Sequence, residues 1–233
     1  AAASVGKRLV PLGTPLTTAD PPATGPRGAL YEEIYGDGVL SAKNCAGTHV
    51  HFEKGAVRRQ LNLLTALDPA LALVSSSPYY RGDRWLNCSR AAAYRTECGD
   101  PFERYCGLWS YADSVGEWQD RVETAYEGYR DLAAERGVAP ERVDDHFEPE
   151  DAVLNPVRLR QASPTVEWRA PDTTLPSQAV RLAFDVRRLV SQTRTKPVEV
   201  TESLPETGVG PDAIRVPTFE RLRDLSDAAI RLG

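Results

Sequence analysis

The most constraining feature of this chain is the alternation of apolar and polar residues at positions 45–53, CAGTHVHFE, which predicts a β-strand. Alternate residues of a strand project to the same face. One face suits a hydrophobic core and carries Ala46, Thr48, Val50 and Phe52. The other face carries His49, His51 and Glu53. The chain has only three histidines, and burying polar groups without partners costs free energy. Two imidazoles beside a carboxylate therefore favour a functional site over a structural role.

A second alternating segment, residues 165–170 (TVEWRA), predicts another strand with one polar face. Its apolar face carries Val166, Trp168 and Ala170. Its polar face carries Thr165, Glu167 and Arg169. A glutamate and an arginine on one face form either a buried ion pair or a metal ligand beside a phosphate-binding guanidinium, which stays charged and binds two oxygens at once. The residues alone leave both interpretations open.

Three arginines follow one another closely after residue 77. Arg81 and Arg84 lie in the stretch SPYYRGDR of residues 77–84, and Arg90 lies shortly after it. Taken alone, these residues predict a solvated basic loop. Beside the two predicted strands, they become candidate receptors for the carboxylate of a substrate. The nucleotide-binding motifs GxxxxGK[ST] and GxGxxG and the nucleophile motif GxSxG are absent from the sequence.

The rest of the chain alternates helical patterns with loops. Within a helix predicted at 176–190, Val180, Phe184 and the pair Leu189 and Val190 are expected to face the core. The irregular order of strands and helices favours the α+β class over a regular βαβ series. Loops are predicted at residues 1–28, 75–78 (a turn) and 144–148 (an acidic run), and a further strand at 198–200. Helices are predicted at residues 56–67, 68–74, 86–94, 117–136 and 176–190, with a final helix capped by Thr218.

Composition narrows the classes of function. The 233 residues carry a formal net charge of −5, which argues against binding nucleic acid through bulk positive charge. The sequence contains no run of roughly 18 apolar residues, so no membrane span is predicted. No signal peptide is visible. The four cysteines lack the close pairs of a zinc site. They are expected to be reduced thiols of a cytoplasmic protein, with a Cys98–Cys106 disulfide as the alternative.

Four stretches together resemble the glutamate–cysteine ligase family, in its bacterial and haloarchaeal branch with the related carboxylate–amine ligases. They occur in the family's order and span most of residues 40–190. Each stretch alone is unspecific, and the combination carries the resemblance. The stretches are CAGTHVH at 45–51, SSPYYRG at 76–82, SRA at 89–91 and VEWRAPD at 166–172.

The resemblance implies a fold and a reaction. The fold is a curved antiparallel sheet of the glutamine synthetase and guanidino kinase type, with helices packed on its outer face. The reaction joins the side-chain carboxylate of L-glutamate to L-cysteine at the expense of ATP, through an acyl phosphate, and gives γ-glutamylcysteine for glutathione biosynthesis. Mg²⁺ is the implied cofactor, and the implied partners are these small molecules, with neither nucleic acid nor membrane.

The resemblance also implies roles for four residues. Glu167 matches the sheet glutamate that ligates magnesium, and Arg169 matches the arginine that contacts the transferred phosphate, so both are expected to be catalytic. Arg90 matches an arginine that receives the substrate glutamate. Arg81 is expected in the same substrate cavity.

The two histidines of the first strand match the nucleotide region of the family. His49 is expected to bind the nucleotide and to serve as a metal ligand, and His51 is expected to bind the nucleotide. One departure from the family is the absence of a glutamate-bearing strand before Cys45. The sequence also contains no Met. Residues 1–233 are therefore expected to be one ligase catalytic domain that lacks its N-terminal part.

Two alternatives stay open. The first is a non-catalytic or truncated relative that binds glutamate or a nucleotide. The second is a metal-dependent amidohydrolase, because a strand with a His-x-His pattern also opens the metal site of those enzymes. They need further histidines, and only His146 remains, within an acidic run.

Overall fold

A three-stranded antiparallel sheet joins distant parts of the chain at the centre of the fold. The computed structural model describes residues 2–8, 10–17, 25–74, 78–95 and 103–233, and the statements below concern these residues. The strands are β1 (Val50–Glu53), β5 (Thr165–Trp168) and β4 (Val157–Leu159), in the order β1-β5-β4. The middle strand is therefore the one that carries Glu167.

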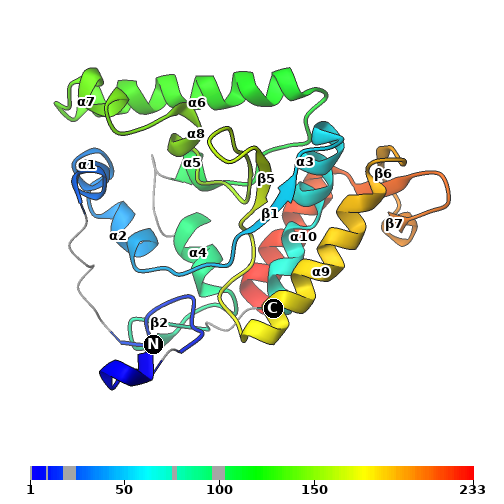
Figure 1. Cartoon of the computed structure of the whole chain (residues 1–233), viewed down its shortest axis with the longest axis horizontal. Coiled ribbons are helices and arrows are strands. Elements are labelled where there is room, and N and C mark those ends of the chain that lie inside the picture. The colour runs from blue at the N-terminus through cyan, green and yellow to red at the C-terminus, as the bar shows by residue number, and fades with distance from the viewer. Residues whose placement is uncertain (1, 9, 18–24, 75–77, 96–102) are drawn as a thin grey trace.

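One face of this sheet packs against helices (Figure 1). The helix α3 (Val57–Ala66) contacts β4 and β5, and α9 (Pro176–Gln192) contacts α3 and β1. The C-terminal helix α10 (Phe219–Leu232) contacts the 3₁₀ helix η2 (Asp68–Val74). The apolar face of the sheet and these helices share one hydrophobic core, which includes Phe52, Leu61, Leu64, Val157, Leu159, Val166, Trp168, Val186 and Ile230.

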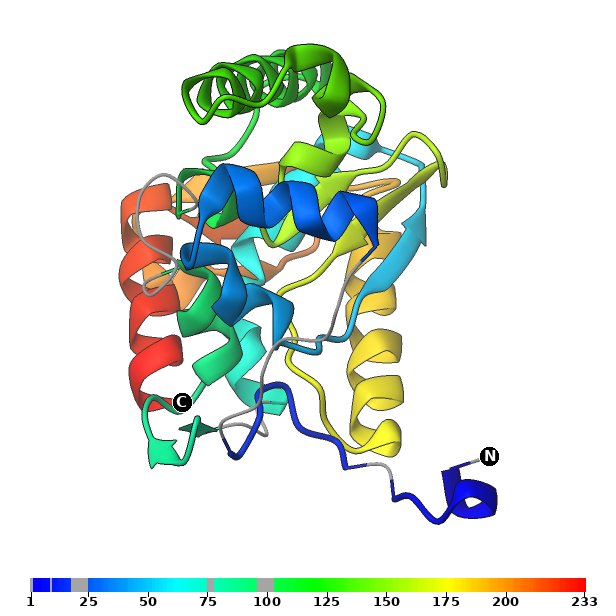
Figure 2. The same ribbon diagram turned by 90° about the vertical axis from the view of Figure 1, so that its left-hand side faces the viewer.

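A second hydrophobic cluster lies under the long helix α6 (Val115–Glu135), which crosses one end of the molecule (Figures 1 and 2). The other elements of this region are α1 (Pro26–Tyr35), α2 (Gly38–Lys43), α7 (Pro140–Asp144) and α8 (Pro149–Ala152). Aromatic rings fill its centre with edge and tilted contacts, a favourable arrangement for such rings. They belong to Tyr31, Tyr35, Tyr105, Tyr129 and Phe147.

The remaining elements are short. A three-stranded sheet in the order β6-β8-β7 contains β6 (Val198–Thr201), β8 (Ile214–Pro217) and β7 (Gly208–Val209), followed by α10. The strands β2 (Tyr79–Tyr80) and β3 (Asp83–Arg84) form a hairpin. The short helices α4 (Ser89–Arg95) and α5 (Glu103–Cys106), with the 3₁₀ helices η1 (Ala2–Val5) and η3 (Leu204–Glu206), complete the described elements.

The predicted α+β class and most of the predicted helices are confirmed. The helices α3, α6, α9 and α10 lie within two residues of the predicted bounds, and residues 68–74 form a 3₁₀ helix. α6 begins two residues early because Ser114 caps it, with its hydroxyl accepting a hydrogen bond from the Glu117 N–H. Thr218 caps α10 as predicted. The predicted turn at 75–78, apart from its last residue, and Cys98 lie outside the described residues.

Three predictions about elements are wrong. The strand predicted from residue 45 begins at Val50, because residues 45–49 form no continuous ladder with the segment after β5: an isolated bridge joins Gly47 to Asp172, and the Thr48 N–H donates to the Pro171 oxygen. Pro26 opens α1 instead of belonging to a loop, since proline suits the first helical turn. The acidic run is not a solvated loop throughout, because Asp144 ends α7 and Glu148 caps α8.

The inward face predicted for α9 is wrong at Val180 and Phe184 and is confirmed at Leu189 and Val190. Val180 and Phe184 are 54% and 57% exposed, whereas Val186 and Val190 are buried. The two exposed side chains line a small hollow beside β1, which also includes Val50 and other residues of that strand. The apolar residues of α9 lie on two stripes, and only the stripe with Val186 and Val190 meets the core.

Candidate functional site

A row of three polar side chains crosses the central sheet. His51 of β1 lies directly opposite Glu167 of β5, and Arg158 of β4 lies opposite Glu167 on the other side. Residues directly opposite in an antiparallel pair project to the same face. Since Val166 and Trp168 enter the helix-covered core, the alternation of β5 places Glu167 on the other face of the sheet. The predicted polar face of residues 165–168 is therefore confirmed.

The Glu167 carboxylate is the meeting point of several charged or polar groups. Its Oε1 lies 2.9 Å from Nδ1 of His49, 3.7 Å from Nε2 of His51 and 3.6 Å from Nη1 of Arg169. Its Oε2 lies 3.9 Å from Nε of Arg158. We refer to His49, His51, Arg158, Glu167 and Arg169 as the Glu167 cluster. Sequence alternation predicted that His49 and His51 share the polar face of one strand and that Glu167 and Arg169 share that of another, and the structure brings these four residues together.

One oxygen of the Glu167 carboxylate has no hydrogen-bond donor among the described residues. Glu167 is 3% exposed, and its Oε2 is buried without a hydrogen bond from any described residue. Arg158 approaches this oxygen at 3.9 Å but lies beyond hydrogen-bond distance. A buried, unsatisfied carboxylate oxygen is costly. Oε2 is therefore the atom of the cluster that is best placed to take a ligand.

The positive charges around Glu167 decide its ionisation. Burial raises the pKa of the Glu167 carboxyl, but the hydrogen bond from His49 and the charges of Arg169 and Arg158 lower it more, to about 2. Glu167 is therefore a carboxylate at neutral pH.

The state of His49 follows from the same contacts. Its hydrogen bond with Glu167 raises the pKa of His49, but burial and the nearby charges of Arg169 and Arg90 outweigh this and lower the pKa below its ordinary value. The imidazole is therefore neutral at pH 7. A carboxylate can only accept, so the proton sits on Nδ1 and leaves a lone pair on Nε2.

Arg158 is the member of the cluster that sequence reasoning did not assign to the site. Its Nη2 donates to the backbone oxygen of Glu150 and lies 3.5 Å from the Asp151 carboxylate. Burial and the charge of Arg169 lower the pKa of Arg158 to about 10, so it stays charged at neutral pH. The available signal was the alternation of Val157, Arg158 and Leu159, but three residues are too short a pattern to predict a strand.

Arg90 lies next to the Glu167 cluster, where its side chain bonds to backbone carbonyl groups and not to the side chains of the cluster. Its Nη1 donates to the carbonyl oxygens of Arg169 (3.1 Å) and Pro171 (3.4 Å), and its guanidinium lies 5.1 Å from the ring centre of Tyr94. The guanidinium also occupies the space next to Gly47, where a Cβ atom would collide with it. Arg90 therefore holds the end of β5 in place, and its expected contact with substrate stays a prediction.

Arg81 is not brought to the Glu167 cluster by any described contact. It lies at the turn of the β2–β3 hairpin, where it and Gly82 both have positive φ, at 54° and 96°. Such values fit the two-residue turns of hairpins. Its guanidinium lies 5.3 Å from the ring centre of Tyr80. Figures 1 and 2 both place this hairpin well away from β5. Its predicted role in substrate binding stays a prediction.

The donor set of the cluster fits magnesium only in part. Magnesium prefers oxygen ligands and binds through one or two carboxylates together with phosphates and water. Glu167 offers one buried oxygen, whereas Glu53 is exposed and lies 3.9 Å from Arg194. Among the described residues, no group of three or more His, Cys, Asp and Glu side chains could hold a metal ion. These residues would therefore take magnesium only as part of a complex with a phosphate-bearing substrate.

The chain matches no protein-family model and no curated protein sequence. None of the helices that the structure describes is both long enough and apolar enough to cross a membrane. The function must therefore be argued from the chemistry of the Glu167 cluster and from the sequence motifs.

Proposed function

We propose that this protein is an ATP-dependent carboxylate–amine ligase of the glutamate–cysteine ligase type. The observation that carries the proposal is the Glu167 cluster, in which one buried carboxylate with an unpaired oxygen lies among His49, Arg158 and Arg169. Two guanidinium groups against one carboxylate leave a positive charge. Such a site suits phosphate and carboxylate oxygens, whose crowding needs cationic neighbours.

In the first step of the proposed reaction, phosphoryl transfer, Arg169 and Glu167 have different roles. An oxygen of the substrate carboxylate attacks the terminal phosphorus of ATP; the new O–P bond forms while the bond to ADP breaks. Arg169 stabilises the charge on the transferred phosphoryl group, since catalysis of this step is mainly positioning and electrostatics. When magnesium enters with the nucleotide, it neutralises phosphate charge, and Glu167 Oε2 is the protein oxygen that would hold it.

The second step needs an acceptor for a proton. The amine nitrogen attacks the carbonyl carbon of the acyl phosphate, phosphate leaves with the electrons of the C–O bond, and the nitrogen loses one proton. His49 is neutral at pH 7 with its lone pair on Nε2, because Glu167 holds the proton on Nδ1. We therefore assign His49 as the proton acceptor of this step.

The finer features of the prediction belong to the same proposal. L-Glutamate and L-cysteine as substrates, a cytoplasmic location and the strongly curved sheet of the glutamine synthetase type are supported by the motif resemblance. An antiparallel sheet with helices on one face and the Glu167 cluster on the other agrees with that architecture.

The test is ADP release from ATP with magnesium, with glutamate alone, with cysteine alone and with both. Release that requires both substrates is the expected result. Release that needs glutamate but is indifferent to cysteine keeps the acyl phosphate and assigns another amine acceptor. Absence of release in all three mixtures contradicts ligase activity of this chain.

A second candidate is a protein that binds a nucleotide or glutamate without turnover. The observation that favours it is the single carboxylate of the cluster, since the described residues provide no second acidic ligand for magnesium there. Binding of ATP, measured by calorimetry, without ADP release in any mixture would select this candidate.

A further inference from the structure

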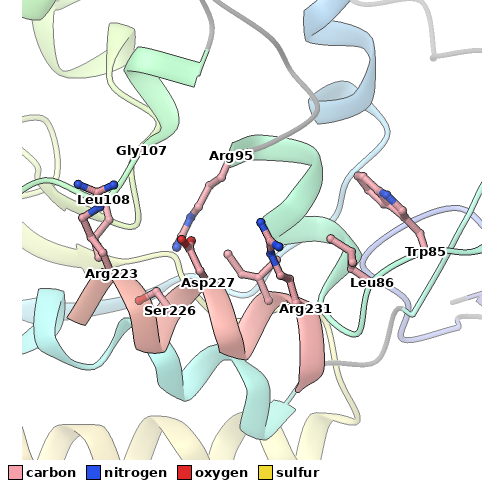
Figure 3. A pocket seen from close by; sticks show the side chains of 10 residues that line it. Trp85, Leu86, Arg95, Gly107, Leu108, Arg223, Ser226, Asp227 and Arg231 are labelled. Atoms are coloured by element: carbon pink, nitrogen blue, oxygen red, sulfur yellow. The ribbon is translucent and has the colours of Figure 1, made fainter. Parts of the chain in front are cut away.

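A cavity of about 560 Å³ lies between α4, α10 and the residues that follow α5 (Figure 3). This volume falls within the range of small-molecule sites. α4 contributes to two regions at once, since Arg90 near its start bonds to the end of β5, whereas Arg95 at its end lines the cavity. The cavity is therefore separate from the Glu167 cluster, although both adjoin the same short helix.

Three guanidinium groups project into the cavity. Arg223 and Arg231 come from α10 and Arg95 from α4, and Figure 3 shows Arg95 between the other two, with its tip beside Asp227. The residues at 223, 227 and 231 follow a four-residue spacing, which places them on one face of the helix. Among the described lining residues, Asp227 carries the only carboxylate. A protein with a net charge of −5 therefore gathers positive charge in this cavity.

The three arginines differ in how they are held. Arg95 donates through Nη1 and Nη2 to the two carboxylate oxygens of the buried Asp68, each at 2.6 Å, which fixes its guanidinium. Arg223 and Arg231 make no ion pair with any described residue, although Asp227 is one helical turn from each. These two guanidinium groups therefore have hydrogen-bond donors available for an anion.

A buried hydroxyl adds an independent sign of a ligand. Ser226 is 2% exposed, lines the cavity, and its Oγ has no hydrogen-bond partner among the described residues. Leaving a buried hydroxyl without a partner costs free energy. A ligand oxygen in the cavity would satisfy it.

One end of the cavity is apolar. Trp85, Leu86 and Ile230 line it there, and Figure 3 shows Trp85 and Leu86 at the end opposite to Arg223 and Leu108. The Trp85 ring is held by a tilted contact with Tyr80, at 5.4 Å between ring centres. An organic group of moderate size would find a flat aromatic surface at this end, while an anionic group would meet the arginines.

We propose that this cavity binds a phosphate-bearing small molecule, with Arg223, Arg231 and Ser226 donating to the phosphate oxygens and Trp85 contacting the organic part. A phosphate monoester offers several anionic oxygens in different directions, so it can satisfy two guanidinium groups and a hydroxyl together. A single carboxylate has two oxygens in one plane and would satisfy only part of this set. The site goes beyond the proposed ligase reaction and does not depend on it.

The experiment is a calorimetric titration of the full chain with phenyl phosphate, without nucleotide or magnesium. Replacing Arg223→Gln and Arg231→Gln together is expected to weaken binding about tenfold or more, since the charge-assisted hydrogen bonds to the phosphate are lost. The control variant carries Arg181→Gln and Arg188→Gln, which remove two exposed arginines from α9 and are expected to leave the affinity unchanged. Circular dichroism verifies that each variant is folded.

A second measurement locates the ligand. The indole N–H resonance of Trp85, assigned with Trp85→Phe, is expected to shift on titration, and Ser226→Ala is expected to weaken binding severalfold. Inorganic phosphate distinguishes the source of the anion: tighter binding of phenyl phosphate assigns the apolar end to an organic group, and equal binding overturns the proposed contact between Trp85 and an organic part.

Four outcomes overturn the proposal: no binding of either phosphate, benzoate binding as tightly as phenyl phosphate, a control variant weakened as much as the α10 variant, or loss of binding in Arg169→Ala. The last outcome would move the anion to the Glu167 cluster and leave the proposed ligase function standing. Loss of ADP release with intact phenyl phosphate binding would do the opposite.

Discussion

Nδ1 of His49 lies 2.9 Å from Oε1 of Glu167, so an imidazole just before β1 and a carboxylate at the centre of β5 form one hydrogen-bonded pair. The two guanidinium groups of Arg158 and Arg169 lie within 4 Å of the same carboxylate. Because all four side chains are partly or fully withdrawn from water, each one sets the protonation of the others. The ionisation of Glu167 should therefore be visible in the stability of the protein.

We predict that the stability contributed by Glu167 depends on pH. The pKa of Glu167 in the folded protein is lowered to about 2, so its contribution is fully present above roughly pH 5 and is lost as the pH falls toward 2. Glu167→Gln should be destabilised by a few kcal/mol at pH 7, since Arg158 and Arg169 lose their countercharge. Urea denaturation at pH 7 and at pH 3 should show a smaller difference between variant and wild type at the acid pH. An unchanged difference would contradict the assignment.

We also predict that Arg169→Ala abolishes ADP release and that Glu167→Gln reduces it by roughly 100-fold or more, a magnitude typical of lost electrostatic stabilisation. Within the described part of the chain, the Arg169 side chain donates no hydrogen bond, and its ion pair is with Glu167 at 3.6 Å. The variant Arg169→Ala should therefore remain folded by circular dichroism.

The control for this prediction is Arg188→Ala, which removes an exposed arginine of α9. Full activity is expected in the control. Turnover retained in both Arg169→Ala and Glu167→Gln would remove these residues from the site.

Sequence alternation located four of the five residues of the Glu167 cluster because both segments have one predominantly apolar face. Val166 and Trp168 enter the core, which forces Glu167 to the opposite face. Pairing between the two segments then brings His51 opposite Glu167. Periodicity in each segment thus predicted the face, whereas the register that joins them came only from the structure.

Other features could not be predicted from local pattern. Phe184 belongs to an apolar stripe of α9 that fits the helical period as well as the stripe of Val186 and Val190 does. Only tertiary packing determines which of the two stripes is buried. Arg158 lies on a strand of only three residues. The backbone role of Arg90 depends on contacts with Arg169 and Pro171, which are distant in sequence.

A third prediction concerns the pH dependence of turnover. Because the pKa of His49 is lowered from its ordinary value, the neutral form that accepts a proton is present at pH 7 and is lost only on the acid side. The rate of ADP release should therefore decrease as the pH is lowered, with a midpoint below the ordinary histidine pKa of roughly 6.5. His49→Gln should reduce turnover and remove this acid limb.

The matched control is His146→Gln, at an exposed position after α7. This variant should keep both the rate and the acid limb. If the acid limb persists in His49→Gln, another group accepts the proton.

The last prediction concerns the contact between Gly47 and Arg90. A Cβ at position 47 would collide with the Arg90 guanidinium, which is buried and bonded to the carbonyl oxygens of Arg169 and Pro171. Gly47→Ala should therefore cost roughly 1–3 kcal/mol, as overpacking does, because Arg90 must leave those oxygens. In an Arg90→Ala background the same substitution should cost much less, since the colliding group is gone. Urea denaturation of the four proteins gives the coupling. Equal costs in both backgrounds would show that Arg90 does not fill the space beside Gly47.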